Sequence, residues 1–327
     1  MDIAILGAGA WGSALAAALS SHHRVLVWTR SAAQRTRIAA TRRSEYLPDI
    51  ELPARVTVTD QIAEARGHDL AIAATPTAGL REALAALADH ARPMPLLWAC
   101  KGFELATTRL PHEIVAETLP SWREVGALSG PSFALEVARG LPAALTVASS
   151  DAAFARRAAT ALHHAPLRIY SSGDVIGVEL GGALKNIMAI AAGISDGLGL
   201  GANARAALIT RGLAEMARLG VRMGGEPDTF MGLTGLGDLV LTATGDLSRN
   251  RTVGTRIASG MPLQRVLAEL GHVAEGVSSA RAARELARHH GVAMPITEAV
   301  CAVLFEGLAP MTAVEALLSR EARPEQA

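Results

Sequence analysis

Several features that mark specialised classes of protein are scarce in this 327-residue chain. Cysteine occurs twice, at Cys100 and Cys301, far apart and outside any metal-ligand spacing, so we expect a reduced protein without a metal site. Neither sign of charge dominates, because lysine plus arginine number 31 and aspartate plus glutamate also number 31. This balance gives no support for nucleic-acid or membrane-surface binding as the main task. Aromatic residues make up only 3% of the chain, so aliphatic residues and alanine must supply its cores.

Long hydrophobic runs are also missing. No stretch approaches the roughly 18 uninterrupted apolar residues that suggest a membrane span. The most apolar region, residues 187–202, is broken by Asp196 and several glycines. The opening residues MDIAILGAGA lack the basic region of a signal peptide and lead directly into a strand-like run. We therefore expect a soluble, cytoplasmic protein, whose length suggests roughly two domains.

The first half of the chain alternates short apolar runs with helical patterns. Strands are expected at residues 3–6, 24–28, 69–74, 95–100, 124–130, 143–149 and 167–172. Strands that alternate with helices favour parallel βαβ units and an α/β doubly wound sheet. From about Asp174 the pattern is helical, with helices expected at 175–193, 205–219, 251–259, 262–270, 278–290 and 296–306. The sequence thus predicts an α/β domain over residues 1–172 and a second, all-α domain over residues 173–327.

A glycine-rich turn joins the first expected strand to the first expected helix. The segment GAGAWG places Gly7, Gly9 and Gly12 in GxGxxG spacing. Gly7 would permit the tight turn, Gly9 the approach of a pyrophosphate to the helix N-terminus, and Gly12 the close packing of helix on strand. An ordinary strand-to-helix turn is the alternative. The strand–turn–helix–strand context favours a dinucleotide site in a Rossmann-type sheet.

The end of the second expected strand bears on which dinucleotide binds. An NAD-selective site usually has an acidic residue there, which bonds the ribose hydroxyls. Here the chain reads WTRSA, with Arg30 at that place and no acid beside it. A guanidinium suits the 2′-phosphate of NADP, although a solvated surface arginine is the alternative. The sequence thus favours NADP as the preferred cofactor without excluding NAD.

Two stretches place polar groups at the ends of expected strands in the first half. In WACKGFE, Lys101 follows a strand and should emerge at the carboxyl edge of the sheet, where ligands bind in such folds. An exposed loop lysine is the alternative. In LSGPSFALEV, a strand ends at Gly130 and Ser132 precedes a helix. Either small polar contacts to a ligand or a Gly-Pro turn with an N-cap serine would account for this pattern.

A third stretch, TGLGDLVLTATGDLSRNRTVG, lies in the helical half. Ser248, Arg249 and Asn250 offer a hydroxyl, a guanidinium and an amide near a helix start, a combination that suits a phosphate. A capped helix with a solvated arginine is the alternative. Asp238 lies in a glycine-rich turn, where it could orient a lysine or bond a substrate hydroxyl. As a turn former it would need no function.

The segment GALKNIMAI carries a Lys-Asn pair in the middle of an apolar helix. Leu184, Ile187 and Met188 fall at helical spacing, so one face should pack into a core close to Lys185 and Asn186. A buried, unpaired ammonium is costly and tends to lose its proton. A lysine that snorkels to solvent along its own stem is the alternative.

Taken together, these motifs resemble the NAD(P)-dependent glycerol-3-phosphate dehydrogenase family in its bacterial form. The blocks that carry the resemblance occur in the family's order and are GAGAWGSALA, CKGFE, LSGPSFALEV, ELGGALKNIMAIAAGISDGLG and GLTGLGDLVLTATGDLSRNRTVG. The similarity extends from residue 1 to about residue 315. It implies reversible oxidation of sn-glycerol 3-phosphate to dihydroxyacetone phosphate. In bacteria the family mainly runs the reduction, for phospholipid synthesis, and a homodimer is implied.

The resemblance also implies roles for particular residues, with Lys185 as the catalytic acid/base. Substrate contacts are implied for Lys101, Gly130, Ser132, Lys185, Asp238, Ser248, Arg249 and Asn250. Cofactor contacts are implied for Ala10, Trp11, Arg30, Lys101, Ala134, Arg249, Val273 and Glu275, beside the glycine loop. Since Ala10 is often serine in the family, only a backbone contact would survive there. Partial burial and the charges of Lys101 and Arg249 would lower the pKa of Lys185 toward the working pH.

Two other functions compete with this one. A β-hydroxyacid or 6-phosphogluconate type of dehydrogenase shares the architecture and the lysine. Its pattern places an asparagine four residues after the lysine, where this chain has Ala189, and the asparagine here is the adjacent Asn186. A non-catalytic NADP sensor would bind the cofactor and regulate a partner. Such a sensor would not need Lys101, Lys185 and Arg249 together.

Overall fold

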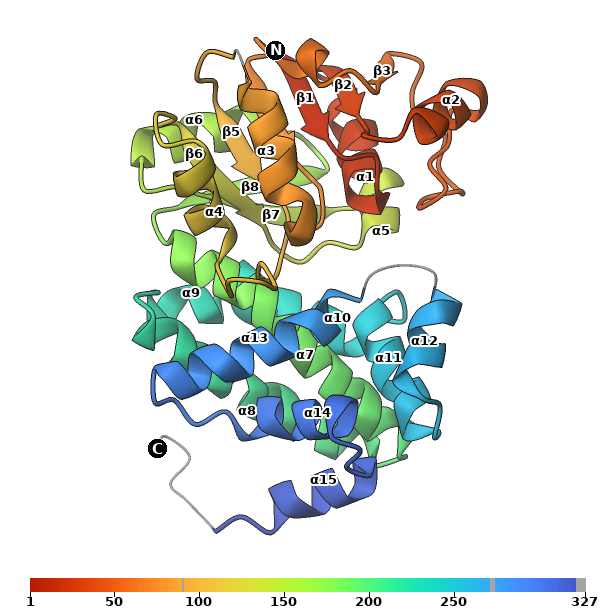
Figure 1. Ribbon diagram of the computed structural model, residues 1–327, viewed down its shortest axis with the longest axis vertical. Helices are drawn as coiled ribbons and strands as arrows, with labels where there is room; N and C mark the ends of the chain where they lie inside the picture. Colours follow the sequence, from red (N-terminus) through yellow and green to blue (C-terminus); the bar gives the residue numbers. More distant parts are fainter. Residues whose placement is uncertain (90, 271–273, 322–327) are drawn as a thin grey trace.

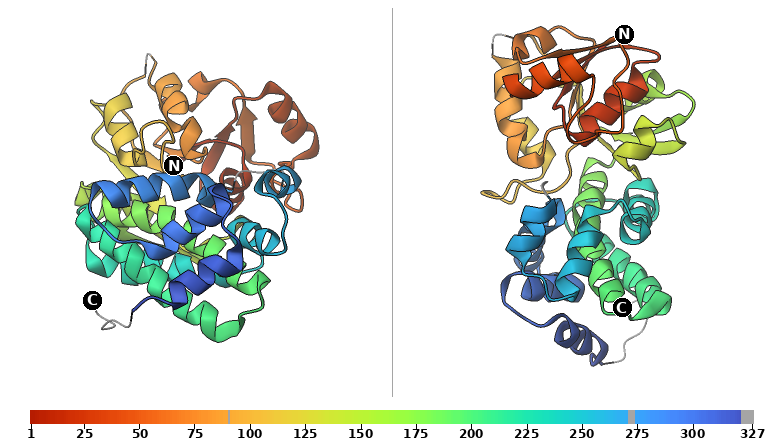
Figure 2. Two further views of the ribbon diagram at one scale, coloured as in Figure 1. Left: turned by 60° about the horizontal axis from the view of Figure 1, so that its bottom comes forward. Right: turned by 90° about the vertical axis from the view of Figure 1, so that its right-hand side faces the viewer.

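The computed structural model describes residues 1–89, 91–270 and 274–321, and it has two parts. An α/β part contains the N-terminus and lies above a helical part in Figure 1, and the side view in Figure 2 shows the same division. The described residues of the α/β part form one eight-stranded sheet. Its strands are β1 (Asp2–Leu6), β2 (Arg24–Trp28), β3 (Val56–Thr59), β4 (Leu70–Ala73), β5 (Leu96–Trp98), β6 (Val125–Ser129), β7 (Ala143–Ala148) and β8 (Leu167–Ser172). All of the expected strands are present, and β3 is additional.

The order of the strands creates a crevice beside β1. The sheet runs β3-β2-β1-β4-β5-β6-β7-β8, and β1 pairs in parallel with both β2 and β4. The first six strands thus have the order of a dinucleotide-binding sheet. In such sheets ligands bind outside the carboxyl ends of the strands, at the point where the strand order reverses. The glycine loop follows β1 and therefore lies at that point.

The sheet is not parallel throughout, which corrects the expectation of parallel βαβ units along the whole α/β part. β6 and β7 pair antiparallel, with Leu128 opposite Val147, whereas β7 and β8 run parallel to each other. The connection from β6 to β7 contains only the five-residue helix α5 (Ala134–Ala138). A parallel crossover usually needs a longer helix that carries the chain back along the sheet. Because α5 is too short for this, β7 starts at the edge where β6 ends.

Helices cover both faces of the sheet. Besides α5, the helices of the α/β part are α1 (Ala10–Leu19), α2 (Ala32–Thr41), α3 (Leu80–Ala88), α4 (Pro111–Thr118), α6 (Ala152–Leu162) and the short 3-10 turns η1 (Ile62–Ala65) and η2 (Thr77–Gly79). In β1, Ile3 and Ile5 pack into a core that includes residues of α1 and α6. Ala4 and Leu6 point the other way, into a core that includes residues of α3 and α4. This alternation is the two-residue period of a strand buried on both faces.

The helical part follows β8 without further strands in the described residues. It consists of α7 (Val175–Gly197), α8 (Gly201–Arg222), α9 (Pro227–Met231), the π-helical segment η3 (Leu233–Gly237), α10 (Asp238–Thr244), α11 (Arg249–Ala258), α12 (Leu263–Leu270), α13 (Glu275–His289), α14 (Pro295–Phe305) and α15 (Pro310–Leu318). The expected helices of this half are all present. α9, α10 and α15 are additional, and α9 and α10 were missed because they are too short for a periodic pattern.

α7 is the central helix of the helical part. It begins after Asp174, whose side chain accepts a hydrogen bond from the Gly177 N–H at 2.7 Å. Every residue from Gly177 to Ser195 is buried, and α8, α10, α11 and α13 pack around the helix. By length and composition α7 could cross a membrane, but 89% of its most apolar window is buried inside the protein. Its apolar surface is thus used in packing, as in a core helix.

Side chains of each part pack into the hydrophobic core of the other part. Val178, in the first turn of α7, belongs to the core that α3 and α4 share with the sheet. Phe103 and Leu110 lie in the segment after β5, yet they pack into the core of the helical part. These exchanges fix the end of β5 against the start of α7, and that junction carries the site.

Arginines of the segment 35–43 hold the loop between α2 and β3 in place. Arg37 pairs with Glu45. Arg42 donates to the carbonyl of Val56 at 3.0 Å, and Arg43 donates to the carbonyl of Pro48 at 2.9 Å. These bonds hold a loop that has no regular secondary structure to satisfy its carbonyl groups.

Candidate active site

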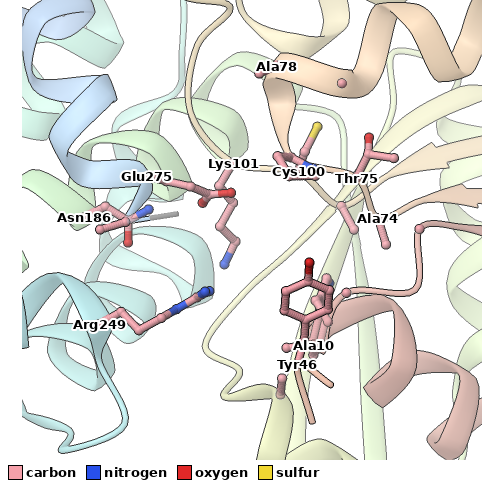
Figure 3. Close-up of a pocket in the computed structure, with 18 of the residues that line it drawn as sticks. Ala10, Tyr46, Ala74, Thr75, Ala78, Cys100, Lys101, Asn186, Arg249 and Glu275 are labelled. Atoms are coloured by element: carbon pink, nitrogen blue, oxygen red, sulfur yellow. The ribbon is translucent and has the colours of Figure 1, made fainter. Parts of the chain in front are cut away.

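A cleft of about 1640 Å³ opens between the carboxyl edge of the sheet and the helices α7, α11 and α13. Pockets for single small ligands are typically about 300–1,000 Å³, so this cleft has room for a dinucleotide and a second small molecule. Figure 3 shows charged side chains from both parts of the chain facing its interior. Lys101 comes from the α/β part, and Arg249 and Glu275 come from the helical part.

The glycine loop forms one end of the cleft and fits a bound pyrophosphate. Gly7 has a φ of +121°, which favours glycine, and a Cβ on Gly12 would lie 1.9 Å from the Gly7 carbonyl oxygen. A Cβ on Gly9 would meet nothing within 4 Å, because Gly9 faces the open cleft. No side chain from the N-cap position bonds the first turn of α1. The first N–H groups of this helix can therefore bind an anion.

Two lysines share one buried carboxylate at the centre of the site. Lys185 Nζ donates to Asp238 Oδ1 at 2.5 Å, and Lys101 Nζ donates to Asp238 Oδ2 at 2.6 Å. Lys185 also donates to Thr242 Oγ1 at 2.8 Å, while Lys101 donates to the Gly130 carbonyl at 3.2 Å. Asp238 has no exposed surface and Lys185 is only 7% exposed. Lys185 thus does not snorkel to solvent but lies in a fixed, ion-paired position.

The environment lowers the pKa of Lys185 to about 8. Burial is the largest cause, and the positive charge of Lys101 adds to the lowering. The carboxylates of Asp238 and Glu275 oppose it. Burial acts to raise the pKa of Asp238, but the two lysines outweigh it and hold that pKa below its usual value. Lys185 can therefore exist in both protonation states near neutral pH, as a general acid and base requires.

The start of α11 supplies polar groups to the opposite side of the cleft. Ser248 is the N-cap, and its Oγ accepts from the Arg251 N–H at 3.2 Å. Asn250 joins three helices, because its Nδ2 donates to Asn186 Oδ1 at 2.9 Å and its Oδ1 accepts from the Gly276 N–H at 3.0 Å. The Arg249 guanidinium extends into the cleft towards Lys101 (Figure 3). Two cations and a helix N-terminus thus converge where an anionic group would bind.

Gly130 acts through its backbone rather than by lining the cleft. Its φ of +142° favours glycine, and a Cβ there would lie 2.8 Å from the Ala144 carbonyl oxygen. Its own carbonyl accepts hydrogen bonds from Lys101 Nζ and, at 3.1 Å, from Ser132 Oγ. Gly130 therefore connects Ser132 to the lysine pair.

Glu275 is the only carboxylate that Figure 3 labels at this end of the cleft. Burial raises its pKa, while the charges of Arg249, Lys101 and Lys185 lower it. The charge of Arg249 therefore acts on Glu275. The sequence predicts that the charges of both Lys101 and Arg249 lower the pKa of Lys185. In the structure, the positive charge that lowers this pKa is that of Lys101.

Arg30 lies at the far end of the cleft, at the end of β2. Its Nη1 is 3.4 Å from Oε2 of Glu82, a residue of α3 that also lines the cleft. Both side chains are about three-quarters exposed, so this ion pair contributes little and can be exchanged for another partner. Arg30 is therefore available to a ligand at this end of the cleft.

The cleft brings most of the predicted residues together. Those that line it are Gly7, Gly9, Ala10, Trp11, Arg30, Lys101, Ser132, Ala134, Lys185, Ser248, Arg249, Asn250 and Glu275. Gly12, Gly130 and Asp238 lie behind this surface and hold the groups that form it. Val273 falls outside the described residues.

Further residues of the site carried no clear signal in the sequence. Thr242 bonds Lys185 and lies one helical turn after Asp238, so the four-residue spacing could have revealed it. Tyr46 reaches the cleft from the irregular loop between α2 and β3, which no periodicity predicts. Cys100 also lines the cleft, and because burial raises the pKa of its thiol, it forms an uncharged part of the wall.

Comparison with known proteins gives a family for this geometry. Residues 2–155 match the model of the NAD-dependent glycerol-3-phosphate dehydrogenase N-terminus, and residues 174–315 match that of the C-terminus. The glycerol-3-phosphate dehydrogenase [NAD(P)+] of Thiobacillus denitrificans is 58% identical, and the alignment covers 99% of this chain and all of that protein. The enzyme of the same name from Ralstonia nicotianae is 55% identical, with 99% of each chain covered.

A solved structure agrees with these sequence matches. The crystal structure of glycerol-3-phosphate dehydrogenase from Coxiella burnetii superposes with a TM-score of 0.93 at 40% identity, covering 98% of this chain and 99% of that one. The likeness thus includes the sheet, the helical part and the junction that forms the cleft. The chain therefore belongs to the NAD-dependent glycerol-3-phosphate dehydrogenase family.

Proposed function

We propose that this protein catalyses the reversible, NAD(P)-dependent oxidation of sn-glycerol 3-phosphate to dihydroxyacetone phosphate. In the cell the reduction would supply glycerol 3-phosphate for phospholipid synthesis. The observation that carries the proposal is the buried group of Lys185, Asp238 and Lys101, placed between a dinucleotide-type glycine loop and an anion site. The full-length relatives that bear the name of this activity support it.

The dinucleotide would lie along the cleft from Arg30 to the lysine pair. Gly7, Gly9 and the first N–H groups of α1 would hold its pyrophosphate, with Trp11 beside them. Ala134 lines the cleft close to α1 and would contact the cofactor there, and Glu275 lines the cleft nearer the lysines and would contact the nicotinamide half. When bound, the nicotinamide supplies or accepts the hydride. The protein's own task is then to bind and orient the substrate and to move one proton.

Lys185 is the group that would move this proton. During reduction its ammonium donates a proton to the developing alkoxide at C2, and during oxidation the neutral amine takes the proton from the hydroxyl. Asp238 holds the amine in place by a 2.5 Å hydrogen bond and prevents burial from removing its charge entirely. Lys101 provides a second positive charge next to the developing oxyanion.

The substrate's phosphate would bind at the start of α11. Arg249 offers charge-assisted hydrogen bonds, and Ser248 and Asn250 flank the helix N-terminus. The Asn250 amide already bonds Asn186 and Gly276, so its second Nδ2 hydrogen is the one left for a ligand. A phosphate held there would orient the substrate's carbonyl towards Lys185 and the cofactor end of the cleft.

We infer that NADP is preferred to NAD, with Arg30 as the residue that distinguishes them. Arg30→Gln should raise the KM for NADPH about tenfold, since a hydrogen bond to a charged group contributes about 1.5–3 kcal/mol and each 1.4 kcal/mol is a factor of ten. The KM for NADH should change less than about twofold, because NADH has no 2′-phosphate there. Steady-state kinetics with each cofactor provide the measurement. Arg35→Gln, an exposed arginine of α2 outside the cleft, is the matched control. Equal effects on both cofactors would remove this role from Arg30.

We further propose that residues 1–172 and 173–327 are the two domains and that the protein is cytoplasmic. The last strand ends at Ser172 and α7 begins at Val175, which supports a division between them. Both cysteines are free thiols, as is usual in a reducing compartment.

A homodimer is proposed on the exposure of α15. This apolar helix packs on α14, and Ala313 is its only buried residue. Leu318 is 80% exposed and Met311 42% exposed, and burial against a second copy would remove them from water. Light scattering should therefore give a mass of twice 33.9 kDa. The mass of one chain at micromolar concentration would contradict the proposal.

The test of the proposed function is an assay with purified protein, dihydroxyacetone phosphate and either NADPH or NADH. Loss of the reduced cofactor's absorbance, dependent on the ketone, is the expected result, and it should be faster with NADPH. Binding of NADPH without turnover would overturn the proposal and favour a cofactor-sensing protein. Turnover of a β-hydroxyacid instead would point to the related type of dehydrogenase.

A further inference from the structure

A second buried carboxylate, Glu179, lies away from the reacting groups at the junction of the two parts. It belongs to the first two turns of α7 and is 6% exposed. Its Oε1 accepts hydrogen bonds from Trp98 Nε1 at 2.6 Å and from the His112 N–H at 2.9 Å. Its Oε2 is 2.5 Å from His112 Nδ1. All of these partners belong to the α/β part, so one side chain joins α7 to β5 and α4.

The elements that Glu179 joins are those that carry the two lysines. Trp98 ends β5, and Lys101 follows it three residues later. Glu179 precedes Lys185 by six residues, about 9 Å along the axis of α7. Between these points the segment after β5 and helix α7 are in close contact, because a Cβ on Gly182 would lie 3.3 Å from Cγ of Lys101. The bond from Trp98 to Glu179 therefore fixes the segment that presents Lys101 against the helix that presents Lys185.

The charges and hydrogen bonds around Glu179 restrict its side chain to one position. Burial raises the pKa of Glu179, and the hydrogen bonds from His112 and Trp98 lower it. The pKa of His112 is raised, because its pairing with Glu179 outweighs the effect of burial. A carboxylate that accepts three hydrogen bonds out of contact with water has few other positions available to it. Water cannot readily replace the hydrogen bonds of the buried Glu179 carboxylate, whereas it competes with the bonds of an exposed ion pair.

We infer that Glu179 is a positioning residue, which sets the geometry of the Lys101–Asp238–Lys185 group by fixing β5 and α4 against α7. It touches neither the cleft nor the reacting atoms, since it is absent from the residues that line the cleft. Its effect is on the placement of the proton donor relative to the substrate oxygen. A displacement of about 1 Å at a reacting group can cost a factor of about 100 in rate. The inference rests on the proposed ketone reduction.

The experiment compares three single variants and one double variant of the full-length protein. Glu179→Ala should lower kcat about 10- to 100-fold while the Kd for NADPH stays within about twofold, because only the proton donor is displaced. Glu179→Gln should keep kcat within about threefold of wild type, since its amide oxygen can still accept from Trp98 and from the His112 N–H. Trp98→Phe removes one donor and leaves a small cavity in the core, and it should lower kcat several-fold. In a double variant, Trp98→Phe should add little to Glu179→Ala, because both cut the same bond.

Glu113→Ala is the matched control. Glu113 Oε2 accepts from the Leu110 N–H at 2.8 Å and so caps the same helix, α4, but the bond stays within the α/β side of the junction. This variant should lower the melting temperature and leave kcat unchanged. Equal losses of kcat in Glu113→Ala and Glu179→Ala would overturn the inference, as would a folded Glu179→Ala protein with wild-type kcat. If Glu179→Ala does not fold, Trp98→Phe decides, and wild-type kcat there would overturn the inference. Wild-type turnover of dihydroxyacetone phosphate is measured first, so failure of the proposed function is seen separately.

Discussion

Lys185→Met should nearly abolish turnover, lowering kcat by about 10²- to 10⁴-fold, the usual contribution of a positioned general acid or base. Methionine is of similar length and apolar, so it can occupy the buried space without an unpaired charge. Asp238 would keep its bond from Lys101, which limits the structural damage. The measurement is single-turnover reduction of dihydroxyacetone phosphate by NADPH, with the Kd for NADPH as the control. Wild-type kcat in a folded variant that binds NADPH would remove the catalytic role.

The pKa of about 8 for Lys185 also predicts how the wild-type rate depends on pH. Reduction needs the protonated amine, so kcat/KM for dihydroxyacetone phosphate should fall as the pH rises through about 8. Oxidation needs the neutral amine, so kcat/KM for glycerol 3-phosphate should rise over the same range. If kcat/KM falls with pH for reduction and rises with pH for oxidation, the transferred proton comes from a group of the enzyme. If kcat/KM changes with pH in the same sense for both reactions, the titrating group is not the proton donor and acceptor.

Asp238→Asn is the second substitution with a large expected effect. It removes the negative charge between two ammonium groups and keeps the volume. Burial and the charge of Lys101 would then lower the pKa of Lys185 further. Of the two carboxylates that oppose this lowering in the wild type, only Glu275 would remain. A nearby opposite charge shifts a pKa by about 1–3 units, so the alkaline limb for reduction should move down by at least about one unit. At pH 7.5 the rate of reduction should fall about 10²-fold or more, since a smaller fraction of Lys185 carries the proton and both lysines lose the carboxylate that holds them in place.

The control for Asp238→Asn is Asp246→Asn. Asp246 pairs with Arg251, its side chain is 97% exposed, and it lies outside the cleft, so its loss should change neither kcat nor the pH profile. The pH profile is the measurement that distinguishes an electrostatic effect from a general loss of structure. An alkaline limb that stays near pH 8 in Asp238→Asn would show that this carboxylate does not set the pKa of Lys185.

Patterns that are local in the sequence were enough to predict much of the fold. The strand at 24–28 was located to the residue, because Val25–Trp28 form an uninterrupted apolar run between polar residues. The glycine spacing of Gly7, Gly9 and Gly12 was also readable, since it lies within one turn, in which Gly7 and Gly12 meet local steric constraints and Gly9 faces the cleft. The direction of β7 was not, because it depends on how far α5 can carry the chain. Local periodicity shows that a strand exists but not which neighbour it pairs with.

The site divides in the same way. Sequence patterns alone pointed to the candidate side chains of the site: a lysine on an apolar helix, a lysine after a strand, and a Ser-Arg-Asn group at a helix start. Their interactions with one another could be found only in the folded chain. It placed Asp238 between Lys101 and Lys185, although Lys101 and Asp238 are 137 residues apart. It also joined Trp98 to Glu179 across 81 residues. The reason is physical: a pKa and a proton-transfer distance depend on burial and on neighbouring charges in space, and these neighbours come from separate elements that meet only when both cores are packed.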